Sequence, residues 1–320
     1  MNKSFFLTIT LCGFTCLLTA CNESTPMKQQ KIANKGIVDA QISSDHRFTV
    51  FASTNHNIGV WDNDKGNLRY EWSHAQKQVP NIVALSISGN NRYVLTAEKR
   101  NIVLWDAQTG KALRYLAVKS DIQAIALSHK GSRALLGLQN AKAIYLDLDS
   151  GQKLKSLQHL ETINSVALSR DGRYALTGSD DKLAVLWDLK TNKPLHQWKH
   201  AKRVRYVTFS PQSNYTLTAA SQDSINIWHV NTGQLASQLK GKSLTITAAQ
   251  FSQDESQFSL GLVPNQIELR QTNNAQLLRH WKAAKPNTWK PSSNFFYAVS
   301  LDKDNNMMSV DSQGFLSWWK

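Results

Sequence analysis

Short runs in which apolar and polar residues alternate recur along most of the chain, and polar turn residues separate them. Residues 163–198 hold four such runs, "INSVALS", "YALTGS", "LAVLW" and "KPLHQW". Alternation over four to six residues, bounded by Asp, Gly, Asn and Ser, is typical of β-strands. The pattern therefore predicts an all-β protein built from groups of four antiparallel strands.

This four-strand group is repeated at a nearly constant interval. The third strand of each copy runs into one slot, which we call the Trp slot. In chain order the slot is assigned to Trp61, Trp105, Leu146, Trp187, Trp228, Leu269 and Trp318. Successive slots lie 44, 41, 41, 41, 41 and 49 residues apart. One sheet cannot bury both of its faces alone, so we expect the seven copies to stack against one another in a ring.

The two ends of the chain are expected to meet in one copy of the unit. The last copy stops at Lys320, directly after its third strand, so it lacks a fourth strand. The segment "MKQQKIANKG" precedes the first strand of copy one by the same offset at which "QKLKSLQHLE" precedes that of copy four. We expect residues near Met27 to Ala33 to supply the missing strand, because closing the ring protects the sheet edges.

Units of this length with Trp-Asp after the third strand resemble the blades of WD40 β-propellers. The resemblance implies a seven-bladed propeller sealed by its N-terminal strand, the velcro closure typical of that family. It also implies a buried hydrogen-bond chain within a blade, which copy four alone can supply completely, with His159, Thr177, Asp181 and Trp187. Most copies lack one or more members. The family uses this set structurally, so the resemblance argues against a hydrolase role for it.

The N-terminus has the features of an export signal. A short basic head, residues 1–3, precedes an apolar stretch, residues 4–20, and the sequence "LTAC" follows. It resembles a bacterial lipoprotein signal, which implies cleavage before Cys21 and lipidation of that cysteine. The two other cysteines, Cys12 and Cys16, would be removed. We therefore expect neither a disulfide nor thiol catalysis in the mature chain.

These observations divide the chain into three parts. Residues 1–20 form the cleaved signal peptide, residues 21–27 the lipidated cysteine and a short tether, and residues 28–320 a single propeller domain. Position 22 is Asn. In enteric-type bacteria Asp at this position resembles a signal for inner-membrane retention, so Asn22 favours the outer membrane, with the protein facing the periplasm.

Charge suggests the chemistry of the partner. The chain has 37 Lys and Arg against 23 Asp and Glu, a formal net charge of +14, which favours anionic partners. In the WD40 architecture the loops between strands two and three, and those leading to the next blade, share one face of the disc. The basic residues assigned to that face, which we call the basic face, are Lys77, Lys99, Arg100, Lys119, Lys199, Lys202, Arg203, Arg205, Lys240 and Lys242. Few acids accompany them.

We expect the basic face to bind an acidic envelope protein or a phosphate-bearing envelope polymer. Nucleic acid would suit the charge, but the export signal argues against it. The sequence holds no zinc spacing, no Gly-rich phosphate loop and no nucleophile elbow. No catalytic residue, metal site or cofactor is therefore assigned, and we expect a non-enzymatic scaffold for protein interactions in the bacterial envelope.

Two alternatives remain. The turns in "DAQTGKALRY" and "DLDSGQKLKS" resemble those of quinoprotein-type propellers, a group that includes lipoproteins of outer-membrane protein assembly. That resemblance implies an accessory role in assembly, although the docking tryptophan of the pattern is displaced in this chain. A propeller-type enzyme is the other alternative. A fold by itself does not decide among these functions.

Overall fold

The computed structural model describes residues 24–34, 36–54, 58–74, 81–241, 244–283, 295–302 and 306–320. Four features predicted from the sequence lie outside these residues. They are the signal peptide, the lipidation site Cys21, and Lys77 and Lys242 of the basic face.

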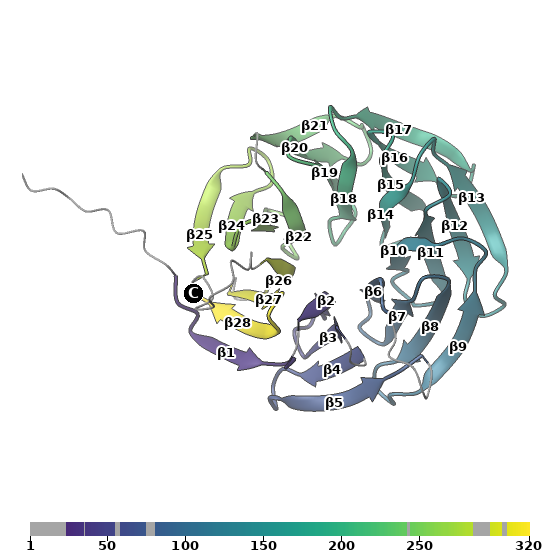
Figure 1. Cartoon of the computed structure of the whole chain (residues 1–320). Helices are drawn as coiled ribbons and strands as arrows, with labels where there is room; N and C mark the ends of the chain where they lie inside the picture. The colour runs from purple at the N-terminus through teal and green to yellow at the C-terminus, as the bar shows by residue number, and fades with distance from the viewer. Residues whose placement is uncertain are drawn as a thin grey trace, which may run out of the picture.

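Seven antiparallel sheets of four strands stand as blades around a central axis (Figure 1). The strands of each blade follow one another from the centre of the ring to its rim. Blade 1 contains β2 (Ile37–Ile42), β3 (Phe48–Ser53), β4 (Ile58–Asp62) and β5 (Asn67–Trp72). Blade 2 contains β6 (Ala84–Ile87), β7 (Tyr93–Ala97), β8 (Asn101–Asp106) and β9 (Ala112–Ala117). Blade 3 contains β10 (Ile122–Leu127), β11 (Arg133–Leu138), β12 (Lys142–Asp147) and β13 (Lys153–Gln158).

The remaining blades repeat the same order. Blade 4 contains β14 (Ile163–Leu168), β15 (Tyr174–Ser179), β16 (Leu183–Asp188) and β17 (Lys193–Lys199). Blade 5 contains β18 (Val204–Phe209), β19 (Tyr215–Ala220), β20 (Ser224–His229) and β21 (Leu235–Lys240). Blade 6 contains β22 (Ile246–Phe251), β23 (Gln257–Leu262), β24 (Gln266–Gln271) and β25 (Leu277–Lys282). Blade 7 contains β26 (Phe296–Leu301), β27 (Met307–Asp311), β28 (Phe315–Trp319) and β1 (Lys28–Lys31).

The seven-bladed fold and its closure by the N-terminal strand are confirmed. Strand β1 pairs antiparallel with β28, with Lys28 opposite Trp318 and Lys31 opposite Phe315. The chain is tied to blade 6 as well, because the Ser24 N–H donates to the Lys282 carbonyl over 2.9 Å. Blade 7 therefore takes strands from both ends of the sequence, and the ring has no open sheet edge at the join.

Two of the seven Trp-slot assignments are wrong by one residue. The slot follows from the pairing between the second and third strands, as seen for Trp187 in blade 4. The equivalent strand pairing makes Arg270 the slot residue of blade 6 and Trp319 the slot residue of blade 7. The sequence pattern predicts Leu269 and Trp318 in these slots instead.

Each error has a local cause. In blade 6 the alternation of apolar residues draws the alignment to Leu269, which is buried. Arg270 can occupy the slot because its guanidinium bonds Glu268 at 2.7 Å and the Ala275 carbonyl at 2.7 Å. In blade 7 two adjacent tryptophans fit the pattern equally well. Trp319 is the more buried of the two, with 2% of its surface exposed, and it makes the indole–hydroxyl bond, to Ser309.

The hydrophobic core lies between blades. Leu95 of blade 2 and Leu136 of blade 3 are fully buried and belong to one cluster with Ile122. The middle strands are mostly buried, as in β15 and β16, whereas outer strands such as β9 are largely exposed. Neighbouring blades thus cover each other's faces, and the outer strands form the rim of the disc (Figure 1).

Candidate functional site

A continuous hydrogen-bond chain runs through blade 4. His159 lies just before β14, Thr177 on β15, Asp181 in the turn after β15, and Trp187 on β16. The His159 Nδ1 is 2.8 Å from Asp181 Oδ2, and its Nε2 is 2.7 Å from Thr177 Oγ1. The Trp187 indole N–H donates to the same hydroxyl over 2.8 Å. The structure therefore brings the four residues named from the sequence into direct contact.

This chain is closed to solvent. The side chains of His159 and Asp181 are 1% and 4% exposed. Burial raises the pKa of Asp181, but hydrogen bonds from the Leu160 N–H, from His159 and from the Leu183 N–H outweigh it, and the pKa lies below its ordinary value. The carboxylate thus stays charged and partnered inside the blade. A set without access to substrate holds strands together rather than performing chemistry.

Blade 2 contains a similar chain that the sequence patterns missed. His74 Nε2 lies 2.7 Å from Thr96 Oγ1, which accepts the Trp105 indole N–H over 2.8 Å. The other ring nitrogen of His74 is 3.5 Å from the carboxylate of Glu98. Glutamate replaces the aspartate of blade 4, and a longer loop separates the histidine from its threonine. The signal that remained in the sequence was the close spacing of Thr96 and Trp105.

Two further blades keep only part of the chain. In blade 5 the Trp228 indole N–H donates to the Thr218 hydroxyl over 2.8 Å. In blade 7 the Trp319 indole N–H donates to the Ser309 hydroxyl over the same distance. In blade 5 the ring nitrogens of His200 are buried and have no hydrogen-bond partner among the described residues. Burial accordingly lowers the pKa of His200. The remaining blades depend mainly on apolar packing.

The described members of the basic face lie in the loops and strand ends expected for them. Lys99 and Arg100 follow β7, Lys119 follows β9, and Lys202 and Arg203 join blades 4 and 5. Lys199 and Lys240 end the outer strands β17 and β21, and Arg205 lies on β18. These residues therefore occur in blades 2 to 5.

Half of the described basic face is already paired with acids. Asp121 lies 3.2 Å from Lys99 and 2.6 Å from Arg100. The hydrogen bond from Arg100 lowers the pKa of Asp121, so it remains charged. The sequence patterns missed Asp121 as a partner because it comes from the next inter-blade loop along the chain.

Asp180 of blade 4 likewise offsets the charge of two cations of the basic face. Its carboxylate lies 3.8 Å from both Arg203 and Arg205. Arg205 also donates to Asn164 Oδ1 over 3.0 Å. These two arginines therefore carry less free positive charge than their sequence suggests.

Four lysines of the basic face remain exposed and make no ion pair with any part of the chain that the structure describes. They are Lys119, Lys199, Lys202 and Lys240. Lys199 and Lys202 are three residues apart, on either side of the buried His200. They give the basic face its densest free charge, between blades 4 and 5.

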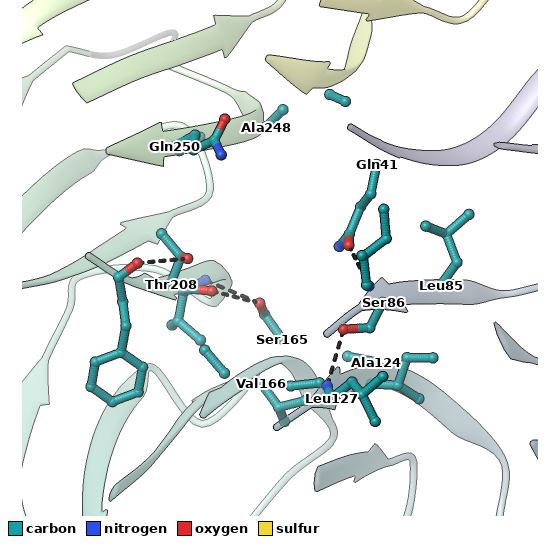
Figure 2. A pocket seen from close by; sticks show the side chains of 18 of the residues that line it. Gln41, Leu85, Ser86, Ala124, Leu127, Ser165, Val166, Thr208, Ala248 and Gln250 are labelled. Carbon is teal, nitrogen blue, oxygen red and sulfur yellow. Dashed lines mark hydrogen bonds between the residues drawn. The ribbon is translucent and has the colours of Figure 1, made fainter. Parts of the chain in front are cut away.

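A cavity of about 620 Å³ occupies the centre of the ring, and the inner strands of all seven blades line it. Side chains bridge adjacent blades there (Figure 2). Ser86 Oγ accepts the Leu127 N–H over 3.0 Å, and Ser165 Oγ accepts the Val207 N–H over 3.0 Å. An inner strand has a free edge, so these bonds satisfy backbone donors that no neighbouring strand reaches.

Asp39 makes a bridge of the same kind between blades 1 and 2. Its Oδ2 accepts the Leu85 N–H over 2.8 Å, and its Oδ1 accepts the N–H of Ala40 over 2.8 Å. Burial raises the pKa of Asp39 to about 7, although these two hydrogen bonds oppose the rise. The cavity therefore contains one carboxyl group whose charge changes near neutral pH.

Neither a metal centre nor a membrane-spanning helix emerges from the described residues. No group of three or more His, Cys, Asp or Glu in that part of the chain could hold a metal ion. No helix there is long and apolar enough to cross a bilayer.

Comparison with protein families supports the WD40 resemblance. The family model described as "WD domain, G-beta repeat" matches residues 151–188 and 192–229. Two successive repeats of this chain therefore resemble WD40 repeats. The matched segments cover strands β13 to β20, each taking the outer strand of one blade and three strands of the next. No curated protein matches the chain.

The matches support a place for the chain in the WD40 β-propeller family. Both segments contribute to blade 4, whose hydrogen-bond chain is complete. Blades 2, 5 and 7 keep the bond from the slot tryptophan to a hydroxyl, whereas the slot residue is Leu146 in blade 3 and Arg270 in blade 6. WD40 propellers generally mediate protein–protein interactions and are typically non-enzymatic.

Proposed function

We propose that this protein is a lipid-anchored, non-enzymatic scaffold of the bacterial envelope, held at the outer membrane on its periplasmic side, and that its basic face binds an anionic partner. The observation that carries the proposal is the group of four exposed lysines on one face of a WD40-type propeller. Their charge is not offset by any ion pair within the described residues.

The chemistry of these lysines favours carboxylates or phosphates. An exposed ion pair contributes only about 0–1 kcal/mol, so a stable complex needs several of them together. Lys199 and Lys202 lie close enough in the chain to engage one acidic segment at the same time. Binding through exposed charges also weakens as salt rises, since ions screen charges beyond about 10 Å at moderate ionic strength.

The anchor is supported by the sequence around Cys21 and by the place where the chain meets the propeller. Ser24, three residues after Cys21, is hydrogen-bonded to the rim of blade 6. Three residues extend to at most roughly 11 Å. A lipidated Cys21 would therefore hold the propeller directly at the membrane surface, without a long stalk.

A binding experiment tests the role of the basic face. A fluorescently labelled polyglutamate peptide is titrated with the purified protein, and anisotropy is measured at low and high salt. We expect binding that weakens at high salt and that is lost in the Lys199→Glu, Lys202→Glu double variant. The matched control is Lys65→Glu with Lys130→Glu, which changes two exposed lysines in turns on the opposite side of the blades.

The outcomes separate clearly. Equal loss of binding in both double variants would mean that only net charge matters, and the proposed face would be wrong. Binding that is insensitive to salt would also contradict it. The anchor is tested separately, by mass spectrometry of the N-terminal peptide from purified membranes. An unmodified Cys21 would refute membrane anchoring.

A further inference from the structure

The rim of the propeller carries most of its excess positive charge. The outer strands are β5, β9, β13, β17, β21, β25 and β1 (Figure 1). Together they contain eleven Lys and Arg residues and one acidic residue, Glu71. The whole chain has a formal net charge of +14, so this rim is far more basic than the rest of the molecule.

Exposed leucines accompany these cations around the rim. Every outer strand of blades 1 to 6 has at least one near its start, and their exposed fractions lie between 38% and 46%. These leucines are Leu68, Leu113, Leu154, Leu195, Leu235, Leu277 and Leu278. Basic and large apolar side chains lying together match the interface of an anionic bilayer, where headgroups attract the cations and the acyl boundary accepts the apolar groups.

A flat bilayer can contact only one sector of a circular rim, and the N-terminal segment indicates which. The Ser24 N–H bonds the Lys282 carbonyl over 2.9 Å, and the Met27 N–H bonds the Trp318 carbonyl over 2.7 Å. The chain therefore joins the rim between blades 6 and 7. Strands β25 and β1 follow one another along the rim at this place (Figure 1). We call the two strands with Met27 the anchor sector.

The anchor sector has the composition that lipid contact needs. Leu277, Leu278 and Met27 are 45%, 39% and 56% exposed. Strand β25 adds Arg279 and Lys282, β1 adds Lys28 and Lys31, and neither strand contains an acid. The two lysines of β1 lie over the rings of Trp318 and Phe315, at 4.5 and 4.1 Å from the ring centres. Those contacts hold the two ammonium groups close to the rim.

We propose that the anchor sector docks on an anionic lipid surface, so that the propeller stands on this edge with its basic face free beside the membrane. The inference rests on the proposed lipid anchor, since the acyl chains select which sector reaches the bilayer. It adds a second, electrostatic contact. One lipid-linked point would let the disc rotate freely, whereas two contacts fix its orientation.

The test compares labels at two equivalent places on the rim of the lipidated full-length product. His280 of β25 and Ser156 of β13 are both exposed and occupy the same register position in their blades, opposite Glu268 and Ile144. Each is replaced by cysteine and labelled with an environment-sensitive fluorophore. The protein is reconstituted into vesicles of phosphatidylcholine, with or without phosphatidylglycerol.

We expect a blue shift and reduced quenching by a water-soluble quencher for the label at position 280, in anionic vesicles and at low salt only. The label at position 156, across the ring in blade 3, should stay water-like throughout (Figure 1). The Arg279→Glu, Lys282→Glu double variant should lose the shift at position 280. The matched Lys153→Glu, Lys155→Glu variant in β13 should keep it.

Several results would overturn the proposal. The two labels could respond alike, the shift at position 280 could persist in neutral vesicles, or it could survive the Arg279→Glu, Lys282→Glu change. A shift seen only after another envelope protein is added would make the sector a protein interface instead. Failure of the anchor is distinguishable, because the mass of the N-terminal peptide reports lipidation and the label reports contact of the rim.

Discussion

Replacing Thr177 by valine should test how much the hydrogen-bond chain of blade 4 contributes to stability. Valine keeps the shape of threonine but removes the hydroxyl. That hydroxyl is fully buried and lies at the centre of the chain, 2.8 Å from the Trp187 indole nitrogen and 2.7 Å from His159 Nε2. In the neutral imidazole whose Nδ1 donates to the Asp181 carboxylate, Nε2 accepts the threonine proton.

The expected loss follows from the groups left without partners. The variant leaves one buried N–H donor, on Trp187, and one buried acceptor, on His159, without a hydrogen-bond partner. A buried polar group without a partner costs about 1–3 kcal/mol. We therefore expect the free energy of unfolding to fall by about 2–6 kcal/mol, a large share of the stability of a typical domain.

Blade 5 offers a matched control. Thr218 occupies the equivalent position and accepts the Trp228 N–H over 2.8 Å, but the ring nitrogens of the nearby His200 make no hydrogen bond with any described residue. Thr218→Val leaves one buried group without a hydrogen-bond partner instead of two. Its loss should be about 1–3 kcal/mol, so Thr177→Val should cost about 1–3 kcal/mol more.

Urea denaturation followed by far-ultraviolet circular dichroism gives both values. The comparison uses the free energy of unfolding in water and the slope against urea, which should be the same in the two variants. Equal losses in Thr177→Val and Thr218→Val would refute the reasoning, because the histidine branch would then contribute nothing. A third variant, Thr177→Val with Trp187→Phe, should lose less than the sum of its single changes, since it removes both members of one bond.

Three further predictions concern the cavity and the basic face. Asp39 has a pKa of about 7, above its ordinary 3.8, so the unfolded chain loses this proton near pH 4 while the folded protein keeps it until about pH 7. Its contribution to stability therefore falls as pH rises through that window. Since each pKa unit corresponds to about 1.4 kcal/mol, thermal denaturation at a series of pH values should show a drop of several kcal/mol that Asp39→Asn removes. Asp121→Ala should change stability by less than about 1 kcal/mol, yet tighten binding of polyglutamate by freeing Lys99 and Arg100. Ser165→Ala should lower the free energy of unfolding, measured by urea denaturation, by about 1 kcal/mol, because it leaves the Val207 N–H between the blades without a partner.

The seven blades could be predicted from the sequence because their causes are local. Alternation along each strand follows from the two-residue period of a β-strand, and the turns follow from short polar segments. The chain His159–Thr177–Asp181–Trp187 was equally visible, since a regular blade keeps its members at constant spacing. In blade 2 the histidine and its threonine are four positions further apart than in blade 4, and Glu98 replaces aspartate, so the spacing no longer indicated a partner.

Strand pairing settled what the alternation left ambiguous. The apolar Leu269 satisfies the alternating pattern as well as a slot residue would, but the register with β23 puts Arg270 in that position. No pattern in the sequence predicts that an arginine fills a slot built for tryptophan. It does so because Glu268 lies two residues earlier on the same strand, within 2.7 Å, and satisfies its charge.

The sequence by itself determined the number of blades, their closure and the excess of positive charge, because each depends on residue type and spacing along the chain. The tertiary structure decided where that charge acts. Asp121 neutralises Lys99 and Arg100 across two loops that the pairing of β8 with β9 brings together. The fourth strand of every blade lies at the circumference because three inner strands fill the space around the axis. Cations that are dispersed along the sequence therefore gather on one continuous rim.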